Sequence, residues 1–368
     1  MDRGLSRTIW ISTLAIIIIG LAALYSASFQ NVRVSNKVFY NQLACAALGV
    51  ILMYAVSRID YRKFYDVAYI LFALNVFLLL AVLFAGRHAL GARRWFELGG
   101  LSFQPSELTK LAVILALGRY FSQHRTGLSF RYLNRPRLLI RDLVIPLVMT
   151  MLPTLMIFKQ PDLGTALLIF GIFYIMWYAS GVNMKLIAWF SGLCVLVVPF
   201  GWHVLKDYQK DRLLVFLNPN IDPLGAGYTI IQSKIAVGSG QLFGKGWLAG
   251  TQNQLNFLPE RHTDFIFSVI GEEWGLVGAL VMLTCYAVLI SCGLKVAEQV
   301  KDHFGTLVCV GIVGIFTLQV VINIGMVLGL CPVVGLTLPM VSYGRTSFMI
   351  FAIMMGFLLN LSKRRTVF

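Results

Sequence analysis

Apolar stretches of about 20 residues recur along the whole chain, separated by short segments where polar and charged residues gather. A helix of about 20 apolar residues can cross roughly 30 Å of bilayer hydrocarbon. The pattern therefore predicts an all-α polytopic membrane protein in which residues 1–368 form a single integral-membrane domain. About ten transmembrane helices are expected, at residues 8–27, 38–56, 64–85, 104–121, 138–158, 163–180, 184–204, 265–294, 305–329 and 342–361. The fourth and sixth stretches carry the weakest apolar signal.

Composition and charge agree with a membrane protein and orient it. Hydrophobic residues make up 58% of the chain, charged residues 13%, and the mean hydropathy is +0.77, a balance outside the range of ordinary soluble domains. Lys and Arg concentrate in alternate short loops, among them residues 57–63, 119–141 and 295–304. The positive-inside rule makes these loops, and with them both termini, cytoplasmic. The net charge of +15 reflects this asymmetry and does not indicate nucleic-acid binding.

One long segment lies between the expected seventh and eighth spans. Residues 205–264 would then be a large extracytoplasmic loop, and their mixture of charged, glycine and apolar residues predicts short interfacial helices. The loop ends in the polar sequence PERHTD. Asp264 directly precedes an apolar run, so a helix N-cap or first-turn acid is a sufficient structural interpretation of that residue.

A cap does not explain the acids that follow Asp264 inside the same span. Glu272 and Glu273 would lie about 12 Å deeper at 1.5 Å per residue. They predict a polar interior that extends down from the outer mouth of the protein. Lys110, one to two turns inside the expected fourth span, is a plausible partner for one of them.

Three other outer segments carry candidate residues. In RRWFELGGLSFQPSELTK, Glu107 and Lys110 are three residues apart on one helix face and can pair, either for function or only to lock two helices. In KQPDLGTAL, Asp162 suits a helix start. Residues 323–344 contain repeated Gly and Pro, which predict a broken or re-entrant segment before the tenth span.

The six cysteines and five histidines are dispersed, without the spacing of metal ligands. The sequence therefore predicts no protein metal site. The run GSGQLFGKG also fails as a phosphate loop, because Ser239 and Gly246 occupy positions where that motif needs Gly and Ser or Thr.

The outer motifs resemble those of the SEDS family (shape, elongation, division and sporulation). The similar stretches are FQPSELTK, QPDLGTA, the run from DPLGAGYTIIQSK to FLPERHTDFIFSVIGEEWGLVG, and NIGMVLGLCPVVGLTLPMVSYG. The resemblance covers nearly the whole chain. It implies a peptidoglycan glycosyltransferase of the cytoplasmic membrane that polymerises lipid II into β-1,4 glycan strands outside the cytoplasm, releasing undecaprenyl diphosphate. It also implies a role in cell elongation, with the elongation machinery and a class B penicillin-binding protein, a transpeptidase, as partners.

The resemblance further implies roles for individual residues. Asp264 matches the essential loop aspartate of the family and is expected to act as the catalytic base. Candidates for substrate binding are the basic residues Arg93, Arg94, Lys110 and Arg261, together with Glu107 as a cavity residue. Glu260, His262 and Asp162 are expected to support the site. No cofactor is certain, although a divalent cation could share the neutralisation of the diphosphate with the basic residues.

Two alternatives and one departure from the family pattern stay open at this point. A lipid II flippase, or a non-catalytic scaffold that activates the penicillin-binding partner, would also have many spans and buried charges. The departure is Arg345, which stands after Ser-Tyr-Gly where the family usually has another glycine. An arginine there is strained if the turn needs a positive φ, or it could contact a headgroup.

Overall fold

The computed structural model describes residues 3–29, 32–89, 92–98, 101–124, 136–223 and 225–363. A helix occupies each of the ten intervals expected to span a membrane. These helices are α1 (Arg3–Ser28), α2 (Val32–Val56), α3 (Tyr61–Ala85), α4 (Pro105–Gln123), α6 (Ile145–Lys159) with α5 (Pro136–Leu139) and a π-helical turn (Ile140–Val144) before it, α7 (Leu163–Ala179), α8 (Met184–Val204), α12 (Ile266–Gln299), α13 (His303–Val327) and α14 (Arg345–Lys363).

Eight helices within the described residues are long and apolar enough to cross a membrane, which confirms a polytopic, mostly helical membrane protein. The two remaining helices, α4 and α7, occupy the intervals with the weakest apolar signal. Helix α7 is apolar but has only 17 residues, and α4 carries charged residues in its first turns. Most side chains of α4 are buried and it packs against α3, α7 and α13, so this helix contacts protein on nearly every face and needs no uniformly apolar surface.

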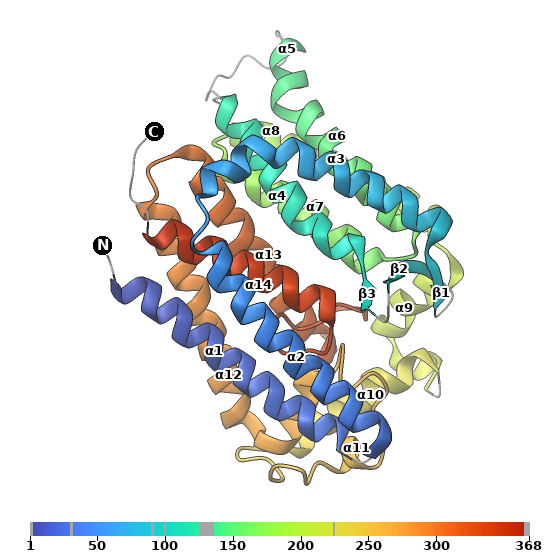
Figure 1. Cartoon of the computed structure of the whole chain (residues 1–368). Coiled ribbons are helices and arrows are strands. Elements are labelled where there is room, and N and C mark those ends of the chain that lie inside the picture. Colours follow the sequence, from blue (N-terminus) through green and yellow to red (C-terminus); the bar gives the residue numbers. More distant parts are fainter. Residues whose placement is uncertain are drawn as a thin grey trace.

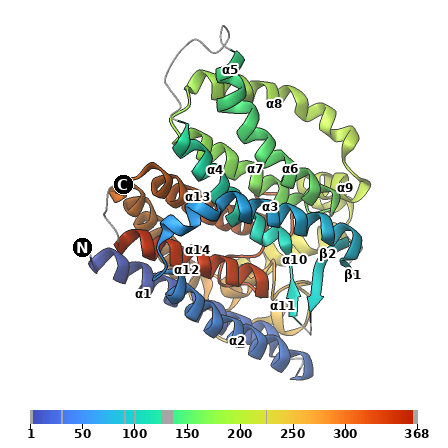
Figure 2. The same cartoon turned by 45° about the horizontal axis from the view of Figure 1, so that its top comes forward.

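The helices form a bundle with two distinct ends. Helix α1 packs along α12, and α2 packs along α14, while α4 and α7 pack against α13 (Figure 1). Helix α1 begins and α14 ends at one end of the bundle, and the strands and the short helices α9 to α11 lie at the other end. Figure 2 shows α5 and α8 on the side of the bundle away from α1 and α2.

A small sheet between α3 and α4 departs from the expected all-α class. Strands β1 (Arg87–Ala89), β2 (Ala92–Leu98) and β3 (Leu101–Phe103) form an antiparallel sheet in the order β1-β2-β3. Residue pairs such as Arg87 with Trp95 and Phe96 with Phe103 set its register. In β2, Arg93 and Glu97 are exposed, whereas Arg94, Trp95 and Phe96 are half-buried. Strands this short are not detected by a search for long apolar runs.

The segment between α8 and α12 folds into short helices at the end of the bundle that also carries the strands. They are α9 (Asp207–Leu217), a 3₁₀ turn (Pro219–Ile221), α10 (Ala226–Ser239) and α11 (Thr251–Gln254). Helix α10 packs against α12. The segment therefore has a defined position against the spans on which the site is built.

Helix α12 is interrupted at Gly275, whose φ of 64° and ψ of −158° are not helical. The segment between α8 and α12, called the outer segment after its expected side of the membrane, places backbone groups in this break and replaces the missing helical hydrogen bonds. The four bonds run from Lys245 N and Gly246 N to the Glu272 and Glu273 carbonyls, both at 3.0 Å, and from Leu276 N and Val277 N to the Gln241 and Leu242 carbonyls, at 2.9 and 3.1 Å. Backbone groups at membrane depth require such partners, so the break fixes the outer segment to the span.

Candidate functional site

A cavity of about 780 Å³ opens at the end of the bundle that carries the sheet and the short helices. Its walls come from β2, β3, the start of α4, the α6–α7 connection, α9, residues 260–264, residues 334–337 and the start of α14. The predicted residues Arg94, Glu107, Asp162, Glu260 and Asp264 all line it. The fold thus brings together residues that lie up to 170 positions apart in the sequence, from Arg94 to Asp264.

Asp264 is a cavity residue and not the cap of α12. The helix begins at Ile266, with Phe265 at the cap position. The backbone carbonyl of Asp264 accepts a hydrogen bond from Asn323 Nδ2 at 2.9 Å. The side chain of Asp264 extends towards Gly335, which has a φ of +74°: a Cβ added to this glycine would lie 3.5 Å from Asp264 Oδ2. The expected N-cap was therefore wrong, because the chain turns into the helix only after the carboxylate has been directed into the cavity.

The surroundings of Asp264 favour its protonated form. The pKa of this carboxyl group is raised to about 7, mainly by burial and also by the nearby carboxylates of Glu260 and Asp162, while Arg212 lowers it. A carboxyl group with a pKa near the working pH can accept a proton and release it again.

The neighbours of Asp264 in the PERHTD sequence have separate positions. Thr263 Oγ1 donates to the carbonyl and the Oε2 atom of Glu260, at 3.1 and 3.0 Å, and Glu260 has a φ of 48°. The His262 carbonyl accepts from Tyr343 N at 2.8 Å. These bonds fix the turn before α12 and attach it to the segment that precedes α14.

Arg261 points away from the cavity. Its Nε donates to the Ala27 carbonyl at 2.7 Å and its Nη1 to the Asn253 carbonyl at 2.6 Å. The side chain joins the end of α1 to α11 and does not line the cavity. The structure thus separates Arg261 from Arg94 and Glu107, the predicted substrate-binding residues that line the cavity.

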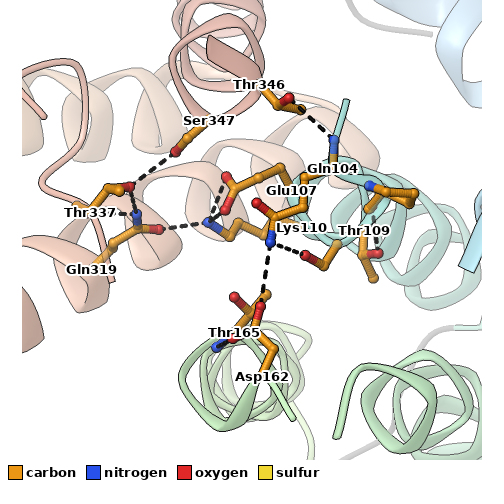
Figure 3. Close-up of polar contacts among 12 residues, drawn as sticks. Gln104, Glu107, Thr109, Lys110, Asp162, Thr165, Gln319, Thr337, Thr346 and Ser347 are labelled. Carbon is orange, nitrogen blue, oxygen red and sulfur yellow. Dashed lines mark hydrogen bonds and ion pairs between the residues drawn. The ribbon is translucent and has the colours of Figure 1, made fainter. Parts of the chain in front are cut away.

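Glu107 and Lys110 form a buried pair at the inner side of the cavity (Figure 3). Lys110 Nζ is 2.9 Å from both carboxylate oxygens of Glu107 and 2.9 Å from Gln319 Oε1. Lys110 is 0% exposed, whereas Glu107 reaches the cavity wall. The pairing expected along α4 is therefore present: the buried ammonium group of Lys110 binds the carboxylate of Glu107.

The predicted pairing of Lys110 with Glu272 or Glu273 was wrong. Lys245 Nζ lies 2.9 Å from Glu272 Oε1, and the backbone amides of Gln252 and Asn253 also donate to this carboxylate. Glu273 accepts from Asn253 Nδ2 at 3.1 Å and from Ser26 Oγ. Both acids are buried and bind the outer segment, because α12 turns them towards α1 and α11 instead of towards α4.

Asp162 and the two neighbouring arginines also take different positions. Asp162 caps α7 by accepting from Thr165 N at 3.1 Å, and Gln104 Nε2 lies 3.4 Å from its other oxygen. Arg94 Nε donates to the Gln160 carbonyl at 2.7 Å, and its Nη2 donates to the Pro161 carbonyl. Arg93 is exposed on β2 and does not line the cavity. Of the two arginines, only Arg94 borders the site.

Several cavity residues were not among the candidates from the sequence. They include Lys206 directly before α9, Tyr208 and Arg212 in α9, and Tyr343 in the segment before α14. Arg212 Nη1 donates to the Val333 carbonyl at 3.2 Å, and the Tyr208 hydroxyl to the Pro161 carbonyl at 3.3 Å. The charged sequence DYQKDR carried a signal for this helix, but its spacing did not indicate which side chains face Asp264.

Arg345 is the first residue of α14 and lines the cavity. It is not among the described residues with positive φ, and Gly344 before it has no positive φ either. The strain expected at this position is therefore absent, because the chain has already entered the helix at Arg345.

In the part of the chain that the structure describes, no group of three or more His, Cys, Asp or Glu side chains could hold a metal ion. The cavity instead combines four basic residues, Arg94, Lys206, Arg212 and Arg345, with four acids, Glu107, Asp162, Glu260 and Asp264.

The model of the family described as "Cell cycle protein", which is named after FtsW, RodA and SpoVE, matches residues 6–367. The chain belongs to this family. It is 40% identical over 364 residues to peptidoglycan glycosyltransferase MrdB of Escherichia coli K12, covering 98% of this chain and 94% of the relative. It is 37% identical over 360 residues to stage V sporulation protein E of Bacillus subtilis, covering 96% and 95%.

Solved structures share the fold of this family member. One chain, from a study titled "Structural coordination of polymerization and crosslinking by a peptidoglycan synthase complex", matches with a TM-score of 0.80 and 31% identity over 97% of both chains. The rod shape determining protein RodA of Thermus thermophilus matches with a TM-score of 0.70 and 29% identity, covering 97% of this chain and 96% of the other. Both likenesses extend over the spans and the outer segment together.

Proposed function

We propose that this chain is a peptidoglycan glycosyltransferase that polymerises lipid II into β-1,4 glycan strands and releases undecaprenyl diphosphate. Relatives that match almost their whole length bear the name peptidoglycan glycosyltransferase. The observation that carries the chemistry is the carboxylate of Asp264, which faces a cavity of about 780 Å³ together with four basic side chains. A cavity of this size can hold sugar rings and a diphosphate.

Asp264 acts as the general base in this proposal. The reaction joins the acceptor 4-hydroxyl oxygen to the anomeric carbon of the donor, breaks the bond from that carbon to the diphosphate oxygen, and transfers the hydroxyl proton to the Asp264 carboxylate. Attack opposite an α-linked diphosphate inverts the anomeric centre and gives a β linkage. The raised pKa of Asp264 makes it a stronger base than an ordinary aspartate while leaving it partly ionised near neutral pH.

The basic residues of the cavity neutralise the leaving diphosphate. Arg212, Lys206, Arg345 and Arg94 line it, and guanidinium groups can bind two phosphate oxygens at once. Arg93 and Arg261 lie outside the lining, so we assign them no direct contact with the substrate. Glu107 remains a binding residue held by Lys110. A divalent cation could join this site, with ligands supplied mainly by the diphosphate.

The orientation in the membrane belongs to the same proposal. Ten helices cross the cytoplasmic membrane, with both termini in the cytoplasm and residues 205–264 outside. The start of α1 and the end of α14 lie at one end of the bundle and helices α9 to α11 at the other, which supports this arrangement. Glycan strands must be crosslinked where they are made, so a class B penicillin-binding protein is the expected partner; one structural neighbour comes from a complex that couples polymerisation with crosslinking.

The test uses the purified full-length protein and an Asp264→Asn variant, each in liposomes with lipid II, alone and with a class B penicillin-binding partner. Glycan length and transbilayer movement of lipid II are both measured. Asn keeps the size of the side chain but is not a base, so we expect polymer from the wild type and a loss of roughly 10²-fold or more in the variant. Arg93→Ala, at an exposed position outside the cavity, serves as the control that retains activity.

The other outcomes favour the alternative functions. Movement of lipid II without polymer would indicate a flippase. If neither protein makes polymer but both activate the transpeptidase of the penicillin-binding partner equally, the chain acts as a scaffold. Full polymerisation by a folded Asp264→Asn variant would remove Asp264 from the chemistry.

A further inference from the structure

Helix α13 carries two amide side chains whose position the proposed reaction does not yet explain. Gln319 and Asn323 are one turn apart and are both 0% exposed, in a helix that is otherwise apolar on its buried face. Burying an amide in a membrane protein is unfavourable unless it forms hydrogen bonds. The bonds of these two residues therefore indicate what they hold in place.

Asn323 holds two backbone segments of the cavity wall at once. Its Nδ2 donates to the Asp264 carbonyl at 2.9 Å and to the Leu336 carbonyl at 2.6 Å. Leu336 follows Gly335, where an added Cβ would lie 3.5 Å from Asp264 Oδ2. One side chain thus sets both the backbone position of Asp264 and the position of the cavity wall at Leu336.

Gln319 continues this connection one turn deeper. Its Nε2 donates to the carbonyl and Oγ1 of Thr337, at 2.8 and 3.3 Å, and its Oε1 accepts from Lys110 Nζ at 2.9 Å. The amide orientation follows from these partners, since an ammonium group can only donate. Figure 3 shows the chain of contacts from Glu107 through Lys110 and Gln319 to Thr337.

The two amides close a bridge between the two carboxylates that border the cavity. It runs from Glu107 to Lys110, Gln319, Thr337 and Leu336, and then through Asn323 to Asp264. Lys110, Gln319, Leu336 and Asn323 are buried, whereas Thr337 is half-buried and lines the cavity. Neither Gln319 nor Asn323 lines the cavity. The amides therefore do not touch a bound substrate and act only through the residues that do.

We propose that Asn323 and Gln319 are positioning residues, which fix the Asp264 carboxylate relative to Glu107 through the segment 335–337. This inference rests on the proposed polymerase function. Misplacement of a reacting group by about 1 Å can cost on the order of 10² in rate. Asn323, which bonds to Asp264 directly, has the larger effect of the two.

The position of Asp264 also sets its proton affinity. It is faced by Glu260 from its own turn, by Arg212 from α9 and by Asp162 from the start of α7. The cavity further presents Glu107, Arg94, Lys206, Tyr208, Tyr343 and Arg345. Loss of the Asn323 bond lets the carboxylate move towards water and away from the acids, so the pH at which it ionises falls.

The experiment compares Asn323→Ala with Asn360→Ala. Asn360 is also a buried amide that donates to backbone carbonyls, those of Val56, Ser57 and Ile59, and it lies in the last part of α14, far from the cavity. Both variants lose comparable hydrogen bonds and some stability. We expect only Asn323→Ala to lower kcat for lipid II polymerisation, by roughly tenfold or more with little change in KM, and to move the acid limb of the pH profile to lower pH.

A second readout does not depend on polymer formation. The infrared carboxyl band of Asp264 is obtained as the difference between each protein and its Asp264→Asn counterpart, and it is titrated with pH. A midpoint shift in Asn323→Ala and none in Asn360→Ala supports positioning, even if the wild type fails to polymerise and the proposed function falls. Equal behaviour of the two alanine variants in both readouts overturns the inference. If Asn323→Ala does not fold, Asn323→Ser, which retains one donor, is judged by the same two readouts.

Discussion

At the scale of single residues, the ionisation of Asp264 gives a pH dependence with a definite sign. Burial raises the pKa of this group from its usual 3.8 to about 7, and a general base works only in its ionised form. The polymerisation rate should therefore fall as the pH drops through about 7 and level off above it. The check is a pH–rate profile of the wild type; an acid limb that stays near pH 4 would contradict the buried position of the carboxylate.

The raised pKa of Asp264 should also make the folded protein less stable as the pH rises, whereas the polymerisation rate rises with pH. The folded protein favours protonated Asp264, so the contribution of this group to stability is present below the unfolded pKa and is lost as the pH rises through about 7. Asp264→Asn cannot ionise. Thermal unfolding in detergent should accordingly show a larger gain in Tm for the Asn variant at pH 8.5 than at pH 5.5, and Asp264 is the only residue that differs between the two proteins.

Asp264 also shows how far sequence reasoning reaches for one residue. Its identity as a site residue followed from the resemblance of the surrounding motif, and the alternative of a helix cap followed from its place before an apolar run. Backbone geometry excludes the cap, because α12 begins at Ile266; the role of Asp264 in the site stays a prediction. Arg212 was missed since its distance from Asp264 depends on how α9 folds back over the cavity, and helix spacing within one element contains no such information.

At the scale of elements, the break in α12 predicts a strict requirement for glycine. Gly275 has a φ of 64° and a ψ of −158°, and a Cβ there would lie 2.3 Å from Gly244 N and 2.7 Å from Leu242 O. A non-glycine residue in this region is strained by about 1–3 kcal/mol before the clash is added. Gly275→Ala should lower Tm by several degrees and release the outer segment, with a loss of polymerisation.

Gly238→Ala is the matched control for that change. Gly238 lies in α10 of the same outer segment, and a methyl group there meets nothing within 4 Å. Alanine should be neutral or stabilise the helix by up to about 1 kcal/mol. Scanning fluorimetry and limited proteolysis of the outer segment distinguish the variants, and equal Tm values for both would show that the break can relax.

The elements themselves differ in how well their sequences predict them. All ten apolar intervals became helices, since runs of about 20 apolar residues have few other solutions in a membrane. The sheet β1–β3 was not expected, because its strands of three to seven residues are too short for a search built on spans. The break at Gly275 was equally invisible: the hydrogen bonds that permit it come from residues 241–246, some 30 positions away.

At the scale of the whole molecule, the position of the cavity predicts which surfaces face each side of the membrane. Leu217, in the outer segment at the end of α9, is 78% exposed, and Ile59 between α2 and α3 is 41% exposed at the other end of the bundle. In spheroplasts, Leu217→Cys should react with a membrane-impermeant maleimide, whereas Ile59→Cys should react only after permeabilisation. The unchanged protein corrects for its own six cysteines. Reaction of Ile59→Cys in intact spheroplasts would place the cavity in the cytoplasm, where the growing strand could not reach the cell wall, and would reverse the proposed orientation.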